Sequence, residues 1–321
     1  MSVLELVVAS SRDLAAGIRG LRLRRSDGSD LPGFTAGAHI DVEVRLADGS
    51  IATRSYSIAS APGERRFYEI AVLRETQGAG GSAFMHDRLT VGTRLNASEP
   101  RNDFPLAADA AEHLLIAGGI GITPILAMVR VLAAEGRRFE MHYCARAPEA
   151  MAFRAEVAAL AGDRAHFHFD GGDPRRGLDL ASALKPPAPG RHVYLCGPKP
   201  MIEAALVLCR DAGWPGEQVH FEFFAEAAAA IGDQPIELVL ARSGRTLTVA
   251  ADRTILETLI EAGAEPLSDC RRGECGVCVT AVIAGEPLHR DYYLTDAEKR
   301  AGKSMCICIS RAQSKRLVLD L

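Results

Sequence analysis

The first hundred residues alternate between apolar and polar positions in short segments of strand length. Pairs such as Asp27-Gly28 and Pro32-Gly33 separate these segments and are typical of turns. A helix is expected near Ala83–Arg88. The pattern predicts a small antiparallel β-barrel. Its expected strands are Leu4–Ser10, Ile18–Arg25, His39–Arg45, Thr53–Ile58 and Tyr68–Val72.

The pattern changes near Ala108, where apolar strands begin to alternate with segments of helical period. Such alternation predicts a parallel sheet with helices on both faces. The expected strands are His113–Ala117, Phe139–Cys144, Ala165–Asp170 and His192–Cys196, and the expected helices are Pro124–Glu135, Ala150–Leu160 and Pro200–Ala212.

An alanine-rich stretch, residues 225–232, has no packing pattern and is interpreted as a linker. A new β-rich pattern starts at Ile236, continues through a helix at Ile255–Ala262, and reaches a cysteine-rich loop followed by a strand at Val277–Ile283. The chain is therefore expected to form three domains: a barrel at 1–107, an α/β domain at 108–228 and an α+β domain at 229–321.

Composition narrows the class of protein. Apolar residues make up 48% and charged residues 24% of the 321 residues, as in soluble globular proteins. The net charge of −4 argues against nucleic acid as the main partner. The N-terminal residues lack the pattern of a signal peptide, and no apolar run is long enough to span a membrane. A cytoplasmic protein with no membrane partner is expected.

Four of the eight cysteines have a spacing that needs a special explanation. Cys270-x4-Cys275-x2-Cys278 is followed by Cys308 after 29 intervening residues. This C-x4-C-x2-C…C spacing is that of plant-type 2Fe-2S clusters, which need four thiolates. Glycines inside the loop would let the backbone turn sharply and direct N–H groups at sulfur.

Two questions remain about these four cysteines: which metal they bind, and which cysteine is the fourth ligand. Structural zinc sites usually consist of two separated cysteine or histidine pairs, which argues against zinc here. Cys306 competes with Cys308 for the fourth position, because strand alternation would place both on one face. The residues alone leave that choice open. The scattered cysteines elsewhere are interpreted as small buried hydrophobic residues.

A strand of the predicted barrel carries the string Arg54-Ser55-Tyr56-Ser57. Alternation would direct Arg54 and Tyr56 to one face, offering a cation for phosphate and a ring for a flavin. Taken alone, such a string more often reflects ordinary cross-strand pairing on a solvent-exposed face. Gly80-Gly81-Ser82 precedes the expected helix and could bind an anion, or could be a loop with an N-cap serine.

Two strand-to-turn junctions in the α/β domain favour a nucleotide site. The first runs Gly118-Gly119-Ile120-Gly121-Ile122-Thr123-Pro124, with Thr123 expected at the N-cap and Pro124 at the first helical position. The second is Cys196-Gly197-Pro198. Ligands of such sheets bind beyond the carboxyl ends of strands, where the two turns would meet. Backbone N–H groups there would face a pyrophosphate.

With its motifs in this order, the chain resembles the phthalate dioxygenase reductase family. These proteins are members of the ferredoxin-NADP-reductase superfamily with a ferredoxin fused at the C-terminus. The resemblance covers essentially the whole chain. Its motifs are RSYS (54–57), GGS (80–82), AGGIGITP (117–124), CGP (196–198), HFEFF (220–224), CRRGECGVC (270–278) and the ending MCICISRAQSKRLVLDL.

The resemblance implies a flavin barrel, a nicotinamide domain and a β-grasp-like ferredoxin domain. It implies Cys308 as the fourth cluster ligand and Phe224 as an aromatic residue near the flavin. The chain departs from the family's pattern at Ala79, immediately before Gly80-Gly81-Ser82, where close relatives often have arginine. The implied FMN site comprises Arg54, Tyr56, Ser57, Gly80, Gly81 and Ser82, and the implied NADH site comprises Gly118, Gly119, Gly121, Thr123, Pro124, Cys196, Gly197 and Pro198.

The implied activity is that of an NADH-dependent reductase. It would pass electrons from NADH through FMN and a 2Fe-2S cluster, one at a time, to a separate terminal oxygenase. A Rieske-type oxygenase is expected, with a cytochrome P450 as the alternative. NADH is favoured over NADPH because Glu149 would oppose a 2′-phosphate near Arg146. No catalytic acid or base is expected, because the cofactors carry the chemistry.

Overall fold

The computed structural model describes residues 3–46, 48–76, 80–224 and 232–321. The chain divides into two compact units, Met1–Phe223 and Phe224–Leu321. The predicted linker up to residue 231, the predicted boundary at 228 and Ala79 lie outside the described residues. The three predicted domain ranges therefore remain predictions.

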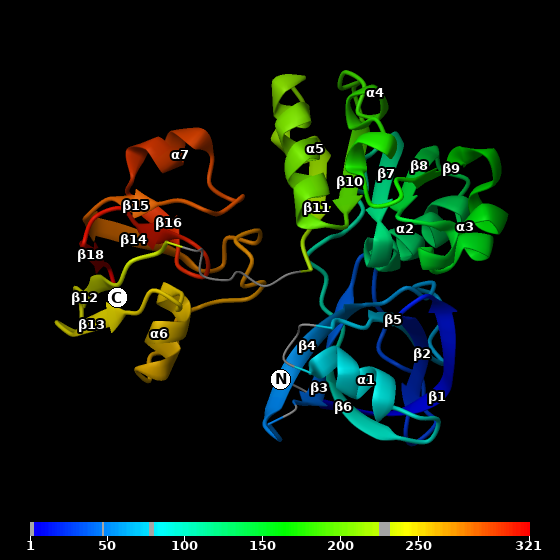
Figure 1. Ribbon diagram of the computed structural model, residues 1–321, viewed down its shortest axis with the longest axis horizontal. Coiled ribbons are helices and arrows are strands. Elements are labelled where there is room, and N and C mark those ends of the chain that lie inside the picture. Colours follow the sequence, from blue (N-terminus) through cyan, green and yellow to red (C-terminus); the bar gives the residue numbers. More distant parts are fainter. Residues whose placement is uncertain (1–2, 47, 77–79, 225–231) are drawn as a thin grey trace. The chain divides into compact units, whose positions relative to one another are not determined.

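The first unit begins with six antiparallel strands, as the alternating pattern predicts (Figure 1). They follow the order β4-β3-β6-β1-β2-β5, and the two edge strands β4 and β5 contact each other. A sheet curled onto itself in this way forms the predicted barrel. The elements are β1 (Val3–Ala15), β2 (Ile18–Arg25), β3 (His39–Arg45), β4 (Ile51–Ser57), β5 (Tyr68–Leu73), α1 (Gly81–Asp87) and β6 (Arg94–Ser98).

Strand β6 has no counterpart in the sequence prediction. Only Leu95 and Ala97 of its five residues point into the core, so its alternating pattern is too short to recognise. Its place in the sheet comes from long-range pairing, because β6 pairs with both β1 and β3. Tertiary contacts thus define this strand, while its own sequence does not.

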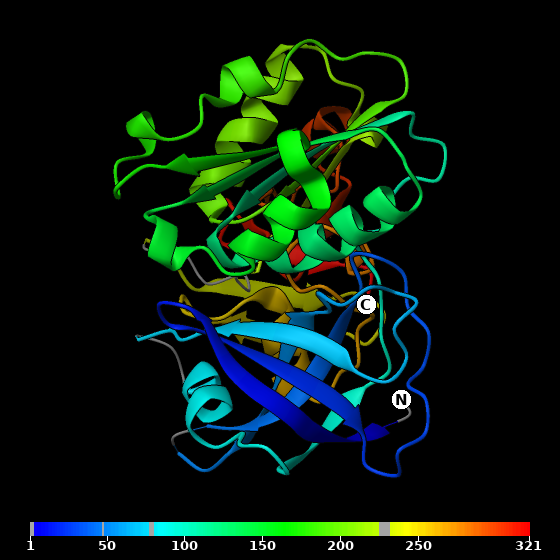
Figure 2. The same ribbon diagram turned by 90° about the vertical axis from the view of Figure 1, so that its right-hand side faces the viewer.

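The second half of this unit is a parallel five-stranded sheet in the order β11-β10-β7-β8-β9, with helices on both sides (Figure 2). This confirms the predicted α/β architecture. The strands are β7 (Glu112–Gly118), β8 (Phe139–Ala145), β9 (Ala165–Phe169), β10 (Arg191–Cys196) and β11 (Val219–Glu222). The α-helices are α2 (Ile122–Ala134), α3 (Arg154–Ala161), α4 (Leu180–Ala183) and α5 (Lys199–Asp211), and short 3-10 helices cover 119–121, 148–150, 162–164, 174–176 and 216–218.

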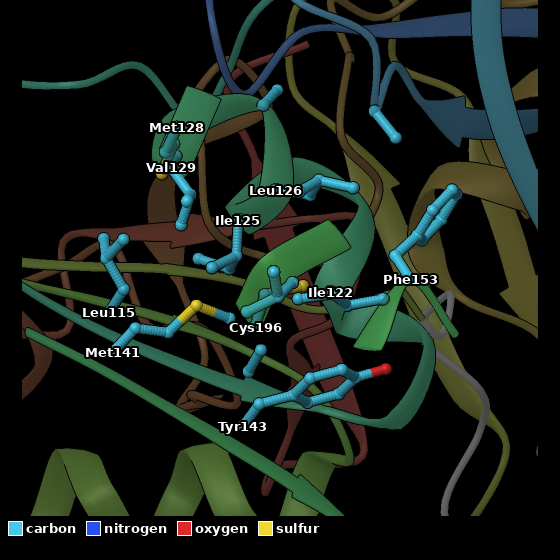
Figure 3. Packing of buried hydrophobic residues seen from close by; sticks show 14 of the residues in the cluster. Leu115, Ile122, Ile125, Leu126, Met128, Val129, Met141, Tyr143, Phe153 and Cys196 are labelled. Carbon is cyan, nitrogen blue, oxygen red and sulfur yellow. The ribbon is translucent and has the colours of Figure 1, made fainter. Parts of the chain in front are cut away.

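Helix α2 supplies much of the core on one face of this sheet. Ile122, Ile125 and Leu126 are fully buried and lie over Tyr143 and Cys196 of the strands (Figure 3). Burying side chains of this size stabilises the fold by roughly 1.5–3 kcal/mol each. The same packing fixes the helix start, where the glycine turn lies.

A buried carboxylate joins the barrel to helix α2. Glu69 of β5 is 1% exposed and forms ion pairs with Arg12, Arg22 and Arg130 at 3.1, 3.2 and 3.3 Å. Arg130 belongs to α2 and also donates to the carbonyl oxygen of Ala59 at 2.8 Å. A buried charge is tolerated only when it is paired, so these contacts hold the two parts of the unit in one arrangement.

The second unit is a mixed five-stranded sheet in the order β13-β12-β18-β14-β16. The central strands β12 and β18 run parallel and their neighbours run antiparallel, which matches the predicted α+β, β-grasp-like fold. Its elements are β12 (Ile236–Leu240), β13 (Thr246–Val249), α6 (Ile255–Glu261), β14 (Val279–Ala284), β15 (Pro287–Leu288), α7 (Asp296–Ala301), β16 (Ser304–Cys306), β17 (Arg311–Ala312) and β18 (Arg316–Leu319). Among the described residues, no helix is both long and apolar enough to cross a membrane.

Candidate cofactor sites

The structure brings Arg54 of the barrel strand β4 to the start of helix α1. A Cβ atom built on Gly81 would lie 3.3 Å from the Cγ and Nε atoms of Arg54, so a glycine lets this side chain lie close to the backbone. Gly80 is the N-cap and has a φ of 95°, which favours glycine. A guanidinium beside free N–H groups of a helix start is suited to a phosphate.

Tyr56 lies on the same face of β4 as Arg54, as alternation predicts. Its ring packs against the barrel core, and burial raises the pKa of its hydroxyl. Ser57 is buried at the end of the strand. Ser82 is the second helical residue and not the N-cap, and its hydroxyl accepts a hydrogen bond from the Glu75 N–H at 3.0 Å. These residues fit the predicted flavin site and remain predictions for that role.

The two glycine turns of the α/β domain meet directly. A Cβ atom on Gly121 would lie 2.3 Å from the carbonyl oxygen of Cys196, and one on Gly197 would lie 2.9 Å from Gly118 Cα. Real Cβ atoms do not approach backbone this closely, so glycine is required at both places. The strands β7 and β10 are neighbours, which places both turns at one edge of the sheet. The fold thus forms the predicted meeting point at the carboxyl ends of the strands.

Helix α2 starts earlier than the sequence indicates. Its N-cap is Gly121, so Thr123 and Pro124 are the second and third helical residues, and the predicted N-cap at Thr123 is wrong. The Thr123 hydroxyl donates to the carbonyl oxygen of Ile120 instead. Proline is accepted at the third position because N–H groups of a first turn have no helical partner. The first turn of α2 therefore begins directly at the glycine turn, at the edge of the sheet where a pyrophosphate could bind.

Two side chains outside the predicted motifs support these turns. The Tyr143 hydroxyl lies 3.2 and 3.1 Å from the carbonyl oxygens of Gly119 and Ala152, and its one proton is shared between these two acceptors. The Met201 methyl group would lie 2.6 Å from a Cβ on Gly197, so it fills the space beside that turn. Neither residue belongs to a local motif, since each acts through a contact between distant elements.

Histidines form two clusters on opposite faces of this sheet. His142 stacks on His166, shares a hydrogen bond with His168 at 3.0 Å, and lies 3.4 Å from a Glu140 oxygen. On the other face, His220 shares a hydrogen bond with His192 at 2.9 Å. Burial and the neighbouring histidines lower the pKa of His142 to about 4, and they lower the pKa of His220 likewise to about 4.

These clusters predict acid sensitivity of the first unit. In the unfolded chain these histidines take up protons near the ordinary pKa of 6.5, whereas in the folded protein they remain neutral down to about pH 4. The folded protein is therefore most stable above pH 6.5 and loses stability as the pH falls from 6.5 toward 4. We expect the free energy of unfolding to fall by about 1.4 kcal/mol per pH unit for each histidine. Urea unfolding between pH 7 and 5, followed by fluorescence of the buried Trp214, measures this. His142→Gln should reduce the slope, and a midpoint independent of pH would contradict the prediction.

In the second unit, the loop after Cys270 directs backbone N–H groups at sulfur. The N–H of Arg272 donates to the Cys270 sulfur at 3.4 Å. The Cys275 thiol, followed by the backbone N–H groups of Arg272, Glu274 and Cys275, lowers the pKa of Cys270 to about 5. Donors aimed at sulfur stabilise thiolates, the form that binds iron. The loop therefore fits an iron–sulfur cluster.

The glycines of this loop allow its close packing. Gly273 and Gly276 have φ values of 78° and 74°. A Cβ on Gly276 would lie 2.2 Å from the Tyr293 ring, which covers the loop at this point. Arg272 and Glu274 are about nine-tenths buried and lie 3.6 Å apart. Arg271 is exposed, so it alone of these three side chains could contact a partner freely.

The surroundings of the two competing cysteines differ. Cys308 accepts a hydrogen bond from the Gly273 N–H and is close enough to Cys270 for their charges to interact. The groups that act on Cys306 are instead Cys278, Asp291 and Cys308. Cys308 thus interacts with Cys270 and Cys278 of the loop, whereas Cys278 is the one loop cysteine that acts on Cys306. This geometry supports the predicted set of Cys270, Cys275, Cys278 and Cys308.

Within the residues that the structure describes, no three His, Cys, Asp or Glu side chains converge on a point suited to a single metal ion. A two-iron cluster has a different requirement, because each iron takes two of the four cysteines. Phe224, predicted to lie near the flavin, is the first residue of the second unit and is 37% exposed. Its predicted role remains a prediction.

Three family models match the chain in the predicted order. Residues 5–105 match an oxidoreductase FAD-binding domain, residues 115–206 an oxidoreductase NAD-binding domain, and residues 238–313 a 2Fe-2S iron–sulfur cluster binding domain. These matches confirm the predicted flavin, NAD and 2Fe-2S cofactors. They leave open which flavin is bound.

Similarity to characterised proteins extends over the full length. The vanillate O-demethylase oxidoreductase of Pseudomonas sp. (strain HR199 / DSM 7063) is 42% identical, and the match covers 99% of this chain and 100% of that protein. The solved structure of phthalate dioxygenase reductase has a TM-score of 0.73 at 39% identity and covers 100% and 98% of the two chains. The chain belongs to the phthalate dioxygenase reductase family.

The reductase also resembles part of a larger protein. An intact type IV self-sufficient cytochrome P450 monooxygenase has a TM-score of 0.76 at 37% identity. The match covers 99% of the reductase but 41% of that chain. The same three-part arrangement therefore occurs as a section of a longer chain in that protein.

Proposed function

We propose that this reductase takes electrons from NADH and delivers them singly to a separate terminal oxygenase of the Rieske type. The observation that carries the proposal is the order of three sites in one chain: the Arg54–Gly81 site, the paired glycine turns and the four-cysteine loop. When bound, the nicotinamide supplies a hydride, the flavin takes up the electron pair, and the cluster carries one electron at a time.

In this scheme the residues of the chain bind the cofactors and hold them in position. Arg54 and the N–H groups after Gly80 hold the flavin phosphate, and Tyr56 offers its ring. The turns at Gly118 and Gly197 hold the pyrophosphate of the nucleotide against the start of α2. N–H groups of the cysteine loop direct positive dipoles at the cluster sulfurs. No side chain needs to transfer a proton in this scheme.

The visible spectrum of the purified protein, before and after anaerobic addition of NADH, tests the proposal. We expect flavin and iron–sulfur absorbance that both bleach with NADH, and reduction of cytochrome c in steady state. A protein that shows both chromophores but does not react with NADH would contradict the proposed electron path. A colourless protein would contradict the cofactor sites themselves.

We further propose FMN as the flavin. The family resemblance favours FMN, and Arg54 beside the start of α1 provides one compact site for a terminal phosphate. Heat release of the flavin followed by mass spectrometry identifies it directly. Released FAD would contradict the proposal.

The reductase is expected to prefer NADH over NADPH. Arg146 follows β8, and the N–H of Gly171 donates to its carbonyl oxygen at 3.0 Å, which places Asp170 beside it. The carboxylates of Asp170 and Glu149 would repel a 2′-phosphate at this edge of the sheet. We expect kcat/KM for NADH to exceed that for NADPH by at least about tenfold, since one unfavourable charge contact of about 1.4 kcal/mol suffices. Steady-state assays with both nucleotides measure the ratio, and a preference for NADPH would contradict the prediction.

A cytochrome P450 is the second candidate partner. The similarity to a section of a self-sufficient P450 favours this alternative, because that chain carries the same three parts. Reconstitution separates the two: the reductase is mixed with a Rieske oxygenase and, separately, with a P450, and NADH-dependent reduction of each is followed. Faster reduction of the P450 would favour the alternative.

A further inference from the structure

The cysteine loop of the second unit, residues 270–278, presents one exposed charged side chain. The charged residues of the loop are Arg271, Arg272 and Glu274. Arg272 and Glu274 lie 3.6 Å apart with side chains that are 10% and 11% exposed, so their opposite charges largely cancel. Arg271, in contrast, is exposed. A protein that approaches this loop therefore meets a single positive charge.

The backbone at Arg271 has a conformation that residues with side chains rarely adopt. Its φ is 53°, and Phe153 is the other non-glycine residue with a positive φ in the described part of the chain. Glycine adopts this conformation without a steric penalty, and glycines occupy the next two such positions of the loop, Gly273 and Gly276. An arginine at a position that suits glycine indicates a role for the side chain that the stability of the loop does not explain.

Exposed apolar surface adjoins the same loop. Val277 is 43% exposed and Tyr293 is 52% exposed. The Tyr293 ring lies against the loop, because a Cβ atom on Gly276 would lie 2.2 Å from it. The backbone holds this segment in place, since the Tyr292 N–H donates to the Gly273 carbonyl oxygen at 3.0 Å. Exposed arginine and tyrosine side chains in one region are typical of the centres of protein–protein interfaces.

We propose that Arg271, Val277 and Tyr293 form the surface on which the terminal oxygenase docks, and that the oxygenase presents carboxylates to Arg271. The inference rests on the proposed function, which makes the cysteine loop the place where electrons leave the reductase. The net charge of the chain is −4, so an acidic partner is repelled by the protein as a whole and attracted at Arg271. Complementary charges of this kind orient a partner and exclude others.

The affinity of the holoprotein for a Rieske oxygenase, measured by isothermal titration calorimetry, tests the inference. Arg271→Glu reverses the charge and should raise the Kd by at least about tenfold at low salt, with a smaller difference at high salt. Arg271→Gly removes the guanidinium and relaxes the backbone, so it should raise the Kd while the iron–sulfur absorbance is kept.

Lys315→Glu is the matched control, because it makes the same change in net charge within the second unit. Lys315 is exposed and directly precedes β18. Strand β18 runs antiparallel to β14, whose first residue, Val279, follows Cys278. Lys315 therefore lies at the end of this ladder that is remote from the cysteine loop, and its replacement should leave the Kd unchanged.

Cytochrome c, a basic protein, provides an electron acceptor of opposite charge. Its KM should fall in Arg271→Glu, because repulsion at the docking surface is replaced by attraction. Damage to the loop would instead weaken the reaction with both acceptors. The two acceptors thus distinguish a change in surface charge from a change in structure.

An unchanged Kd in Arg271→Glu, or an equal increase in Lys315→Glu, would overturn the inference. A higher KM for cytochrome c or a loss of iron–sulfur absorbance in Arg271→Glu would also overturn it, since either would assign Arg271 to the structure of the loop. A failure of the proposed function is distinguishable from these results, because the wild-type protein itself would then neither bind nor reduce the oxygenase.

Discussion

Replacing Cys308 by serine should abolish the iron–sulfur absorbance and leave flavin reduction by NADH intact. Cys308 interacts with Cys270 and Cys278 of the loop, with the Gly273 N–H directed at its sulfur, so the change removes one of four iron ligands. We expect the rate of NADH-dependent cytochrome c reduction to fall by more than about 100-fold. Replacing a residue that only forms a hydrogen bond to a metal ligand has a smaller effect, about 10- to 100-fold. Absorbance spectra, iron analysis and stopped-flow flavin reduction measure the three properties separately.

Cys306→Ala is the matched control, because it removes a buried cysteine two residues away. The cluster absorbance should persist in this variant. The opposite pattern, with the cluster kept in Cys308→Ser and lost in Cys306→Ala, would reverse the assignment of the fourth ligand. Loss of the cluster in both variants would show that both thiols are needed to hold it.

Replacing Gly121 by alanine should weaken both the first unit and its use of NADH. The added Cβ would lie 2.3 Å from the Cys196 carbonyl oxygen, so the two turns must separate. Overpacking against backbone should cost about 3 kcal/mol in the free energy of unfolding. A misplaced nucleotide should reduce kcat/KM for NADH by about 100-fold. Urea unfolding and steady-state assays with ferricyanide measure the two effects.

Gly136→Asn provides the comparison for this variant. Gly136 also has a positive φ, 65°, but a Cβ there would meet no atom within 4 Å. Asparagine tolerates this backbone conformation, so the cost should be at most about 1 kcal/mol and kcat/KM should not change. Equal effects of the two substitutions would show that backbone conformation, and not the contact between the turns, decides the result.

The sequence predicted most of the fold because the patterns were local. Alternation located β2 and β3, and the strand–glycine–helix order located the turn at Gly118–Gly121. What it could not predict depends on contacts between distant elements. Strand β6 is defined by pairing with β1 and β3, and the N-cap of α2 at Gly121 lies against the backbone of Cys196.

The cysteine site likewise combines residues that sequence spacing predicts with one that depends on contacts between distant residues. Spacing alone selected three ligands, because they lie on one loop. The choice between Cys306 and Cys308 depended on which thiol meets Gly273 and Cys270, two residues far away in the sequence. Alternation suggested that both cysteines share a face, but β16 ends at Cys306, so the strand rule does not extend to Cys308. The structure thus supports on geometric grounds a ligand that resemblance had implied.

The position of β18 has a consequence for biosynthesis. This strand, Arg316–Leu319, follows every cysteine in the sequence, yet it lies in the middle of the sheet between β12 and β14. A chain emerging from the ribosome therefore exposes all the cysteines before the sheet that positions them can close. Iron–sulfur insertion must then follow synthesis of this whole unit, and until that time the thiols are open to oxidation and to other metals.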